Sequence, residues 1–414
     1  MEKLKSTLNQ TIYIIFLSLA IITPLLFSTQ TTEIYEVPKM YFVYFASTIL
    51  LTLTIAKFFI DKKIKIPTGA IVISFTIFIL VQVISTLFSQ DKYTSIFGYP
   101  TRLNGGLVSQ FAYLVIFLIG LISLDTKKAK NLLVAIVFAA VAVSLWGIPS
   151  HFGADPSCFV LTGKLTSACW QKEFDPTLRI FSTLGQPNWL ASYLVLILPI
   201  CMAFSLFYRQ NKAKLIFLAA SATILFAIIL TNSRAGLLGL MASLMIFAML
   251  AGIKTIKANI KLISALGIVF LIIAMLFGTN LTSRIKDLIT SQKQVINQPT
   301  KTAKPTQSSL TSGGTESGQI RLIVWHGAID VFKSSPLLGT GPETFVSSYY
   351  KFRPATHNQT TEWQFFYNKA HNEFLNYAAN TGLLGLLSYL SFLSTLIFTI
   401  FKLKNITIVQ KSVI

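Results

Sequence analysis

The 414-residue sequence is 53% hydrophobic and only 12% charged, which is too apolar for an ordinary soluble domain of this length. Its formal charge of +20 would suit a nucleic-acid-binding protein, but the Lys and Arg residues form short clusters between long apolar runs instead of one basic face. The composition therefore predicts a protein embedded in a membrane.

Ten apolar runs are long enough to cross the hydrocarbon core as helices, since about 20 residues span a bilayer and a helix satisfies its own backbone hydrogen bonds. The runs are 10–29, 40–59, 68–88, 106–124, 131–149, 189–208, 214–232, 235–253, 262–278 and 382–401. The first follows Lys3 and Lys5 like a signal peptide, but it is long, lacks a small-residue cleavage site and is followed by further runs. We therefore expect a retained first helix in an all-α, polytopic bundle of about ten spans.

Positive charges near the helix ends predict the orientation. One set of alternate loops carries eighteen Lys and Arg residues, whereas the short loops of the opposite set carry seven. This predicts a multi-pass protein of the cytoplasmic (inner) membrane with both termini in the cytoplasm. We expect three regions: a bundle of nine spans (1–278), an extracytoplasmic loop subdomain (279–381) with a flexible Ser/Thr/Gln/Gly-rich tether (290–319), and the last span with its tail (382–414).

The three cysteines lie in different settings. Cys158 and Cys169 fall in a second long outward connection (150–188), where an oxidising compartment would allow a disulfide as readily as two free thiols. Cys201 lies within a span and is expected to be a small buried residue.

After the tether the pattern becomes helical again. In QIRLIVWHGAIDVF the apolar residues recur at helical spacing, and Arg321 and Trp325 lie one turn apart on the same side. Ser335-Pro336 should end this helix, GTGPETF (339–345) should form a glycine turn, and residues 368–387 should run as a helix toward the last span.

Four outward segments concentrate the polar residues that are scarce elsewhere: 95–107, 179–194, 231–240 and the large loop from 321 onward. All four end on the same predicted side of the membrane. We expect their tips to converge at the boundary between lipid and water.

Three arginines in these segments are candidate anion ligands. Arg234 stands between two spans with scarcely any loop, so it either snorkels to the headgroups or binds an anion at the start of the next helix; the small polar residues of TNSRAG favour the anion. Arg321, one turn before Trp325, and Arg102 leave the same choice between a structural and a binding role. Several arginines on one side favour a pyrophosphate, which needs two or more bidentate donors.

All four histidines are predicted outside. We expect His151 and His357 to be solvated surface residues, and His326 to cap or line its helix. His371 differs because AHNE begins an amphipathic helix that leads into the membrane. An imidazole that titrates near neutrality can remove a proton from an attacking hydroxyl.

Other site chemistries have little support in the sequence. The outward side has no close His/Cys or Asp-x-Asp cluster, and Glu343, Glu362 and Glu373 are too scattered to indicate a metal site. A Walker-type loop and a dinucleotide fingerprint are absent as well. We therefore expect no cofactor, no metal and no nucleic-acid partner.

In their order and spacing, SIFGYPTRLNGG, STLGQPNWLASYLVLILP, TNSRAGLLGL, RLIVWHGAIDVFKSSPLLGTGPETF and KAHNEFLNYAANTGLLGLLSYL resemble the O-antigen ligase/polymerase family of bacterial membrane glycosyltransferases. The resemblance covers roughly residues 95–400. It implies an all-helical, glycosyltransferase C-like fold with an extracytoplasmic active site under the large loop. It also implies transfer of a glycan from an undecaprenyl diphosphate carrier to a hydroxyl of lipid A core, a protein or another glycan, without ATP or an essential metal.

The resemblance assigns roles to three residues: Arg234 and Arg321 hold and neutralise the diphosphate leaving group, and His371 activates the acceptor hydroxyl. Fixed Arg residues at a partly dry interface would stabilise the developing charge. As further substrate-binding residues we predict Arg102, Arg179, Asn188, Trp325 and Glu343. Family members commonly continue with more spans after the AHN helix, so we expect a shortened member or an incomplete reading frame.

Several functions stay open. An O-antigen ligase, a polysaccharide chain polymerase and a protein O-oligosaccharyltransferase share the donor chemistry, and the acceptor is not readable from the sequence. A transporter or flippase for lipid-linked sugars is a more distant alternative, because transporters usually place polar residues near the midplane in repeated broken helices. An inert scaffold whose basic loops hold anionic lipid is a third. The charges here gather on one rim, which favours the enzyme.

Overall fold

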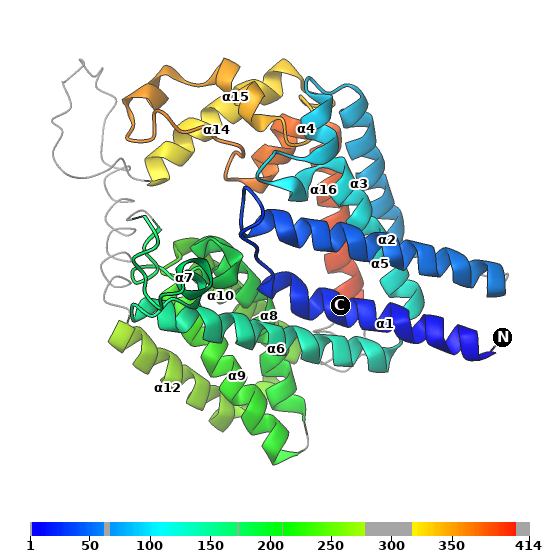
Figure 1. The fold of residues 1–414 in the computed structure, drawn as a ribbon, viewed down its shortest axis with the longest axis vertical. Coiled ribbons are helices and arrows are strands. Elements are labelled where there is room, and N and C mark those ends of the chain that lie inside the picture. The colour runs from blue at the N-terminus through cyan, green and yellow to red at the C-terminus, as the bar shows by residue number, and fades with distance from the viewer. Residues whose placement is uncertain (1, 62–66, 172–173, 209, 278–316, 403–414) are drawn as a thin grey trace. The chain divides into compact units, whose positions relative to one another are not determined.

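The computed structural model describes residues 2–61, 67–171, 174–208, 210–277 and 317–402. Over these ranges the chain is all-helical, and its only extended pairing is the isolated bridge between Tyr99 and Arg102 (Figure 1). The predicted all-α class is confirmed. The predicted tether lies outside the described residues, except that 317–319 begin a helix.

Each of the ten predicted spans coincides over most of its length with one of ten helices. Eight of them are long and apolar enough to cross a membrane: α1 (Glu2–Leu25), α2 (Glu36–Asp61), α3 (Ala70–Leu87), α6 (Thr126–His151), α8 (Pro187–Phe207), α9 (Asn211–Leu230), α10 (Arg234–Ala251) and α16 (Glu373–Lys402). The other two are the shorter apolar helices α5 (Leu107–Ser123) and α12 (Ile260–Phe277). The chain is thus a multi-pass helical membrane protein, and the count of ten spans stays a prediction.

The other described helices lie between these apolar ones along the chain. They are α4 (Lys92–Phe97), η1 (Leu103–Gly105), α7 (Pro156–Thr162), η3 (Ser182–Leu184), α11 (Ile253–Ala258), α14 (Ser317–Ser334), α15 (Phe345–Phe352) and η4 (Ala355–Gln359). Side-chain caps start several of the described helices; Asp91 accepts the amide of Thr94 in α4, and Ser233 accepts the amide of Gly236 in α10. Helix α14 ends at Ser334, as the following Ser335-Pro336 predicts.

The chain forms two compact units. Over the described residues, the first comprises 2–12, 40–61, 67–123 and 317–402, and the second comprises 13–39, 124–171, 174–208 and 210–277. In the first unit α3 packs between α5 and α16, and the Phe75 ring contacts both Phe117 of α5 and Phe392 of α16. Helix α14 lies against α15 and α16 (Figure 1).

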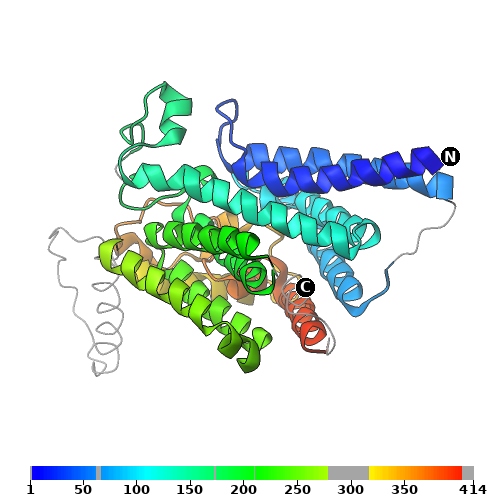
Figure 2. The same ribbon diagram turned by 90° about the horizontal axis from the view of Figure 1, so that it is seen from below.

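In the second unit α6, α8, α9, α10 and α12 lie together as a bundle (Figure 2). Leu194, Ile224 and Ile228 are fully buried or nearly so in its core, where α8 meets α9. The free thiol of Cys201 is buried in the same core, as predicted. Cys158 and Cys169 form a disulfide with their Cα atoms 5.8 Å apart, which resolves the alternative that the sequence left open.

Helix α16 differs from the prediction for 368–387. It begins at Glu373 and is broken at Gly382, whose φ of 67° and ψ of −165° lie in a region that only glycine enters readily. A Cβ on Gly382 would overlap the backbone of Leu337. The glycine is therefore required because another segment approaches the helix at this point.

That segment is the turn 336–344, which contains the GTGPETF glycines. Gly339 and Gly341 have φ of 68° and 116°, so the predicted glycine turn is confirmed. The turn bonds to both sides of the break in α16, because the amide of Leu383 donates to Pro336 O (2.8 Å) and that of Gly341 donates to Asn380 O (2.8 Å). The turn also bonds to the end of α3 through Ser85 Oγ, which donates to Leu338 O (2.7 Å). The backbone polar groups freed by the break are thereby satisfied.

Candidate functional site

Arg321 and His371 line the same cavity in the first unit. The cavity has a volume of about 270 Å³, and its polar lining also includes Glu362, Tyr367 and Asn368. Arg321 lies near the start of α14, and His371 lies two residues before α16 begins. Two of the three residues predicted to be catalytic therefore face one space.

Helix α14 is attached to the His371 segment by a predicted substrate-binding residue. Trp325 Nε1, one turn after Arg321, donates a hydrogen bond to Ala370 O (3.0 Å). Arg321 and Trp325 thus face the same segment, as their helical spacing predicts. His371 itself has a φ of 53°, a left-handed conformation that is uncommon for a residue with a side chain. The Trp325 bond holds the backbone directly before this strained residue.

The surroundings of His371 keep its imidazole neutral. His371 is exposed to solvent, and its ring lies perpendicular to the Tyr367 ring with the two centroids 5.4 Å apart. Desolvation by the nearby protein and then the positive charge of Arg321 lower the pKa of His371, while Glu362 partly opposes them. A histidine with a lowered pKa is mostly unprotonated at neutral pH and can accept a proton.

The sequence did not predict the buried hydrogen-bonded residues that lie next to this cavity. His357 was expected at the surface, but it is 0% exposed, and its Nδ1 lies 2.7 Å from the hydroxyl of Tyr349. Burial and then the charge of Arg353 lower the pKa of His357. Its neighbour Tyr367 donates a hydrogen bond to the Glu362 carboxylate. The expectation was wrong because polar flanking residues gave no sign of the aromatic cluster around His357.

The other two histidines have different surroundings. His326 is exposed on α14. His151 is only half-buried in the second unit, where its ring contacts Phe152 and Phe277. Neither of them lines the cavity of Arg321 and His371.

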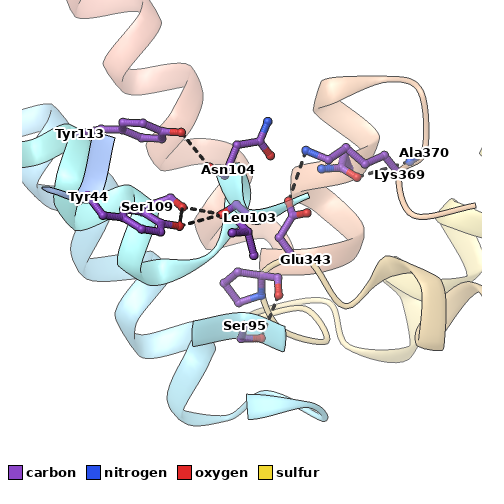
Figure 3. Close-up of polar contacts among 11 residues, drawn as sticks. Tyr44, Ser95, Leu103, Asn104, Ser109, Tyr113, Glu343, Lys369 and Ala370 are labelled. Atoms are coloured by element: carbon purple, nitrogen blue, oxygen red, sulfur yellow. Dashed lines mark hydrogen bonds and ion pairs between the residues drawn. The ribbon is translucent and has the colours of Figure 1, made fainter. Parts of the chain in front are cut away.

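Glu343 lines a second cavity of the first unit, with a volume of about 250 Å³. Its Oε1 atom lies 3.4 Å from Lys369 Nζ, and the Glu343 side chain is only 6% exposed (Figure 3). Burial raises the pKa of the Glu343 carboxyl, and Lys369 partly offsets this effect. Sequence reasoning singled out Glu343 but missed Lys369 and Gln82. The isolated amide of Gln82 within an otherwise apolar span was the available signal.

The other residues predicted to bind substrate or to catalyse the reaction are divided between the two units. Arg102 precedes η1 in the first unit. In the second unit Arg179 Nη2 donates to Asn188 Oδ1 (3.1 Å), and Ser233 Oγ donates to the same oxygen (2.7 Å). Arg234 follows Ser233 as the first residue of α10, and its side chain is exposed. Both roles considered for Arg234, snorkelling and anion binding, require such an exposed side chain.

The four polar segments are thus brought together in pairs. In the first unit 95–107 meets the glycine turn, because Ser95 Oγ donates to Pro342 O (2.9 Å). In the second unit 179–194 meets 231–240 through Arg179, Asn188 and Ser233. Arg234 belongs to one unit, whereas Arg321 and His371 belong to the other. The convergence of all three stays a prediction.

Within the described part of the chain, no three His, Cys, Asp or Glu side chains are arranged to hold a metal ion. The described helices are those of a multi-pass membrane protein. Comparison with family models then shows that residues 219–390 match the O-antigen ligase family. This region therefore belongs to that family, and the resemblance predicted from the motifs is confirmed. Comparison with curated proteins finds no match.

Proposed function

We propose that the protein transfers a glycan from an undecaprenyl-diphosphate-linked donor to an acceptor hydroxyl on the outer side of the cytoplasmic membrane. The observation that carries the proposal is the cavity shared by Arg321 and His371, within the region that matches the family. A neutral imidazole can remove the proton of the hydroxyl, while a fixed guanidinium stabilises the charge that develops on the diphosphate.

The reaction would proceed by attack of the acceptor oxygen on the anomeric carbon. His371 takes the hydroxyl proton, the glycosidic bond to the diphosphate breaks, and the lipid diphosphate leaves with the bonding electron pair. Arg321 and Arg234 bind this leaving group with charge-assisted hydrogen bonds. Attack opposite the leaving group would invert the anomeric centre, and retention in the product, read by NMR, would refute that step. The proposed mechanism uses neither a metal nor ATP.

The disulfide supports the proposed orientation. Cys158 and Cys169 lie in the connection 150–188, which the charge distribution predicts to be outside. Disulfides persist in oxidising compartments and are rare in the cytosol. Labelling of single cysteines introduced into the loops with a membrane-impermeant maleimide would test the orientation directly.

A transfer assay tests the chemistry. Purified full-length protein would be incubated with a lipid-diphosphate oligosaccharide and candidate acceptors. His371→Ala should reduce transfer about 10²- to 10⁴-fold, as expected for loss of a general base. Arg321→Ala and Arg234→Ala should each reduce it about 10²- to 10³-fold, as expected for loss of electrostatic stabilisation.

Matched controls come from α14 itself. His326 and Lys333 are exposed on this helix and line neither cavity. His326→Ala and Lys333→Ala should leave transfer unchanged. Full transfer by His371→Ala and both Arg variants would reject the proposed site. A ladder of glycan lengths among the products would favour a chain polymerase, whereas a single capped acceptor would favour a ligase.

A further inference from the structure

The second cavity of the first unit is polar although three helices of the membrane bundle surround it. It lies where α3 ends and where α5 and α16 begin, and the glycine turn closes one side through Pro342 and Glu343. Its lining includes amide and carboxyl side chains from each of these elements: Gln82, Gln110, Glu343, Glu373, Asn376 and Asn380. This lining is unusual for a membrane protein, in which buried polar groups are costly unless they have partners.

Three buried side chains in this lining have polar atoms without a hydrogen-bond partner in the described structure: Gln82 Nε2, Glu343 Oε2 and Asn380 Oδ1. The three residues are only 2%, 6% and 3% exposed. Each such atom costs about 1–3 kcal/mol when it stays unpaired. One donor and two acceptors therefore border a cavity large enough to hold a ligand that would satisfy them.

The charges of the lining indicate what this ligand is. Two carboxyl side chains, Glu343 and Glu373, face one Lys369, so the cavity does not favour an anion such as diphosphate. Each hydroxyl group is both a donor and an acceptor, so neighbouring hydroxyls match amide and carboxylate groups. Tyr113 and Tyr377 also line the cavity and supply aromatic surface for the C–H groups of a ring.

From this lining we infer that the cavity binds a neutral sugar ring. The inference deepens the proposed function and rests on it for its biological role, since the ring would belong to the donor or acceptor glycan. Residues 367–373 connect the two cavities: Tyr367, Asn368 and His371 line the first, whereas Lys369 and Glu373 line the second. A sugar in the second cavity would thus lie on the other side of the segment that carries His371.

Gly105 offers a way to fill the cavity without removing a polar group. A Cβ at Gly105 would overlap the Glu343 carboxylate, the flexible end of a side chain, and Gly105 does not have a positive φ. Figure 3 shows Glu343 reaching toward Lys369 beside the Leu103–Asn104 turn. Gly105→Ala should therefore displace Glu343 and narrow the cavity with little effect on the backbone. Gly69→Ala is the matched control, because a Cβ there meets nothing within 4 Å.

The test is saturation-transfer-difference NMR on the full-length protein in detergent, with methyl glucoside, methyl galactoside and methyl N-acetylglucosaminide as probes. At least one glycoside should bind. Gly105→Ala should weaken its affinity at least about tenfold, and Gln82→Met should do the same by removing the amide. Gly69→Ala and Gln10→Met, the latter at an exposed position of α1, should bind as wild type. Apparent melting temperatures would confirm that all variants are folded.

Three results would overturn the inference. The first is that no glycoside binds, and the second is that binding is unchanged in both Gly105→Ala and Gln82→Met. The third is that inorganic diphosphate or ethanolamine displaces the bound glycoside at a lower concentration than a second glycoside does. Failure of the proposed function gives a different pattern. In that case wild-type protein would transfer no glycan, yet glycoside binding would still depend on Gly105 and Gln82. Conversely, Arg321→Ala should reduce transfer about 10²- to 10³-fold and leave glycoside binding intact.

Discussion

Replacing Lys369 with Met should destabilise the protein more than replacing Glu343 with Gln, because only the first change leaves a buried charge without its partner. Loss of one partner of a buried ion pair costs about 3–5 kcal/mol. The Glu343 side chain is 6% exposed but that of Lys369 is 33% exposed, so water already screens the pair in part. We therefore expect a loss of about 2–3 kcal/mol for Lys369→Met and about 1 kcal/mol for Glu343→Gln, which keeps the shape of the side chain.

The dependence on pH follows from the raised pKa of Glu343. Burial lifts the pKa above the ordinary value of 4.5, so the folded state holds this proton more tightly than the unfolded state. The resulting stability is present below about pH 4.5 and is lost as the pH rises through the folded-state pKa. Removal of Lys369 raises that pKa further, so Lys369→Met should destabilise the protein more at about pH 7.5 than at about pH 5.

The measurement is thermal unfolding of wild type, both single variants and the double variant at the two pH values, followed by intrinsic tryptophan fluorescence. The double variant should recover most of the stability lost in Lys369→Met, because a neutral amide no longer needs the cation. Equal losses for Lys369→Met and the double variant at both pH values would refute the reasoning from a buried charge.

Three further changes probe the first unit. Gly382→Ala should lower the free energy of unfolding by about 2–3 kcal/mol through backbone strain, and an unchanged melting temperature would argue against the break in α16. Trp325→Phe removes the bond to Ala370, so transfer should fall about fivefold, whereas wild-type rates would show that this bond does not position His371. Arg321→Gln removes a charge that lowers the pKa of His371, so the acidic limb of the pH–rate profile should move to higher pH; in Arg321→Lys it should stay in place.

The helices were predictable because each depends on residues that are close together in the sequence. Each apolar run must satisfy its own backbone hydrogen bonds in lipid, and each of the ten predicted runs coincides over most of its length with a helix. The glycine turn was also predictable from nearby residues, because closely spaced glycines allow the positive φ angles that the turn adopts. The break at Gly382 was not, because it depends on the approach of Leu337, which lies 45 positions earlier in the chain.

The candidate site was predictable only in part. Helical spacing placed Arg321 and Trp325 on one side of α14, and the structure brings both to the His371 segment. The burial of His357 depends on packing against Tyr349 and Tyr367, and no local pattern marks that packing. The pair of Glu343 and Lys369 is likewise a tertiary contact, whose two members come from separate turns.

The two cavities of the first unit have different linings, and each lining suits a different part of a lipid-linked glycan. One presents Arg321 and a neutral His371, which suit a diphosphate and an attacking hydroxyl; the other presents amides and a carboxyl pair, which suit a sugar. In the donor, a single glycosidic bond joins the sugar to the diphosphate, and transfer breaks this bond. The segment 367–373 contributes to both cavities, so His371 stands where the two parts of such a donor would meet. His371, the base of the proposed reaction, thus lies in this connecting segment in a left-handed backbone conformation, two residues before helix α16 begins.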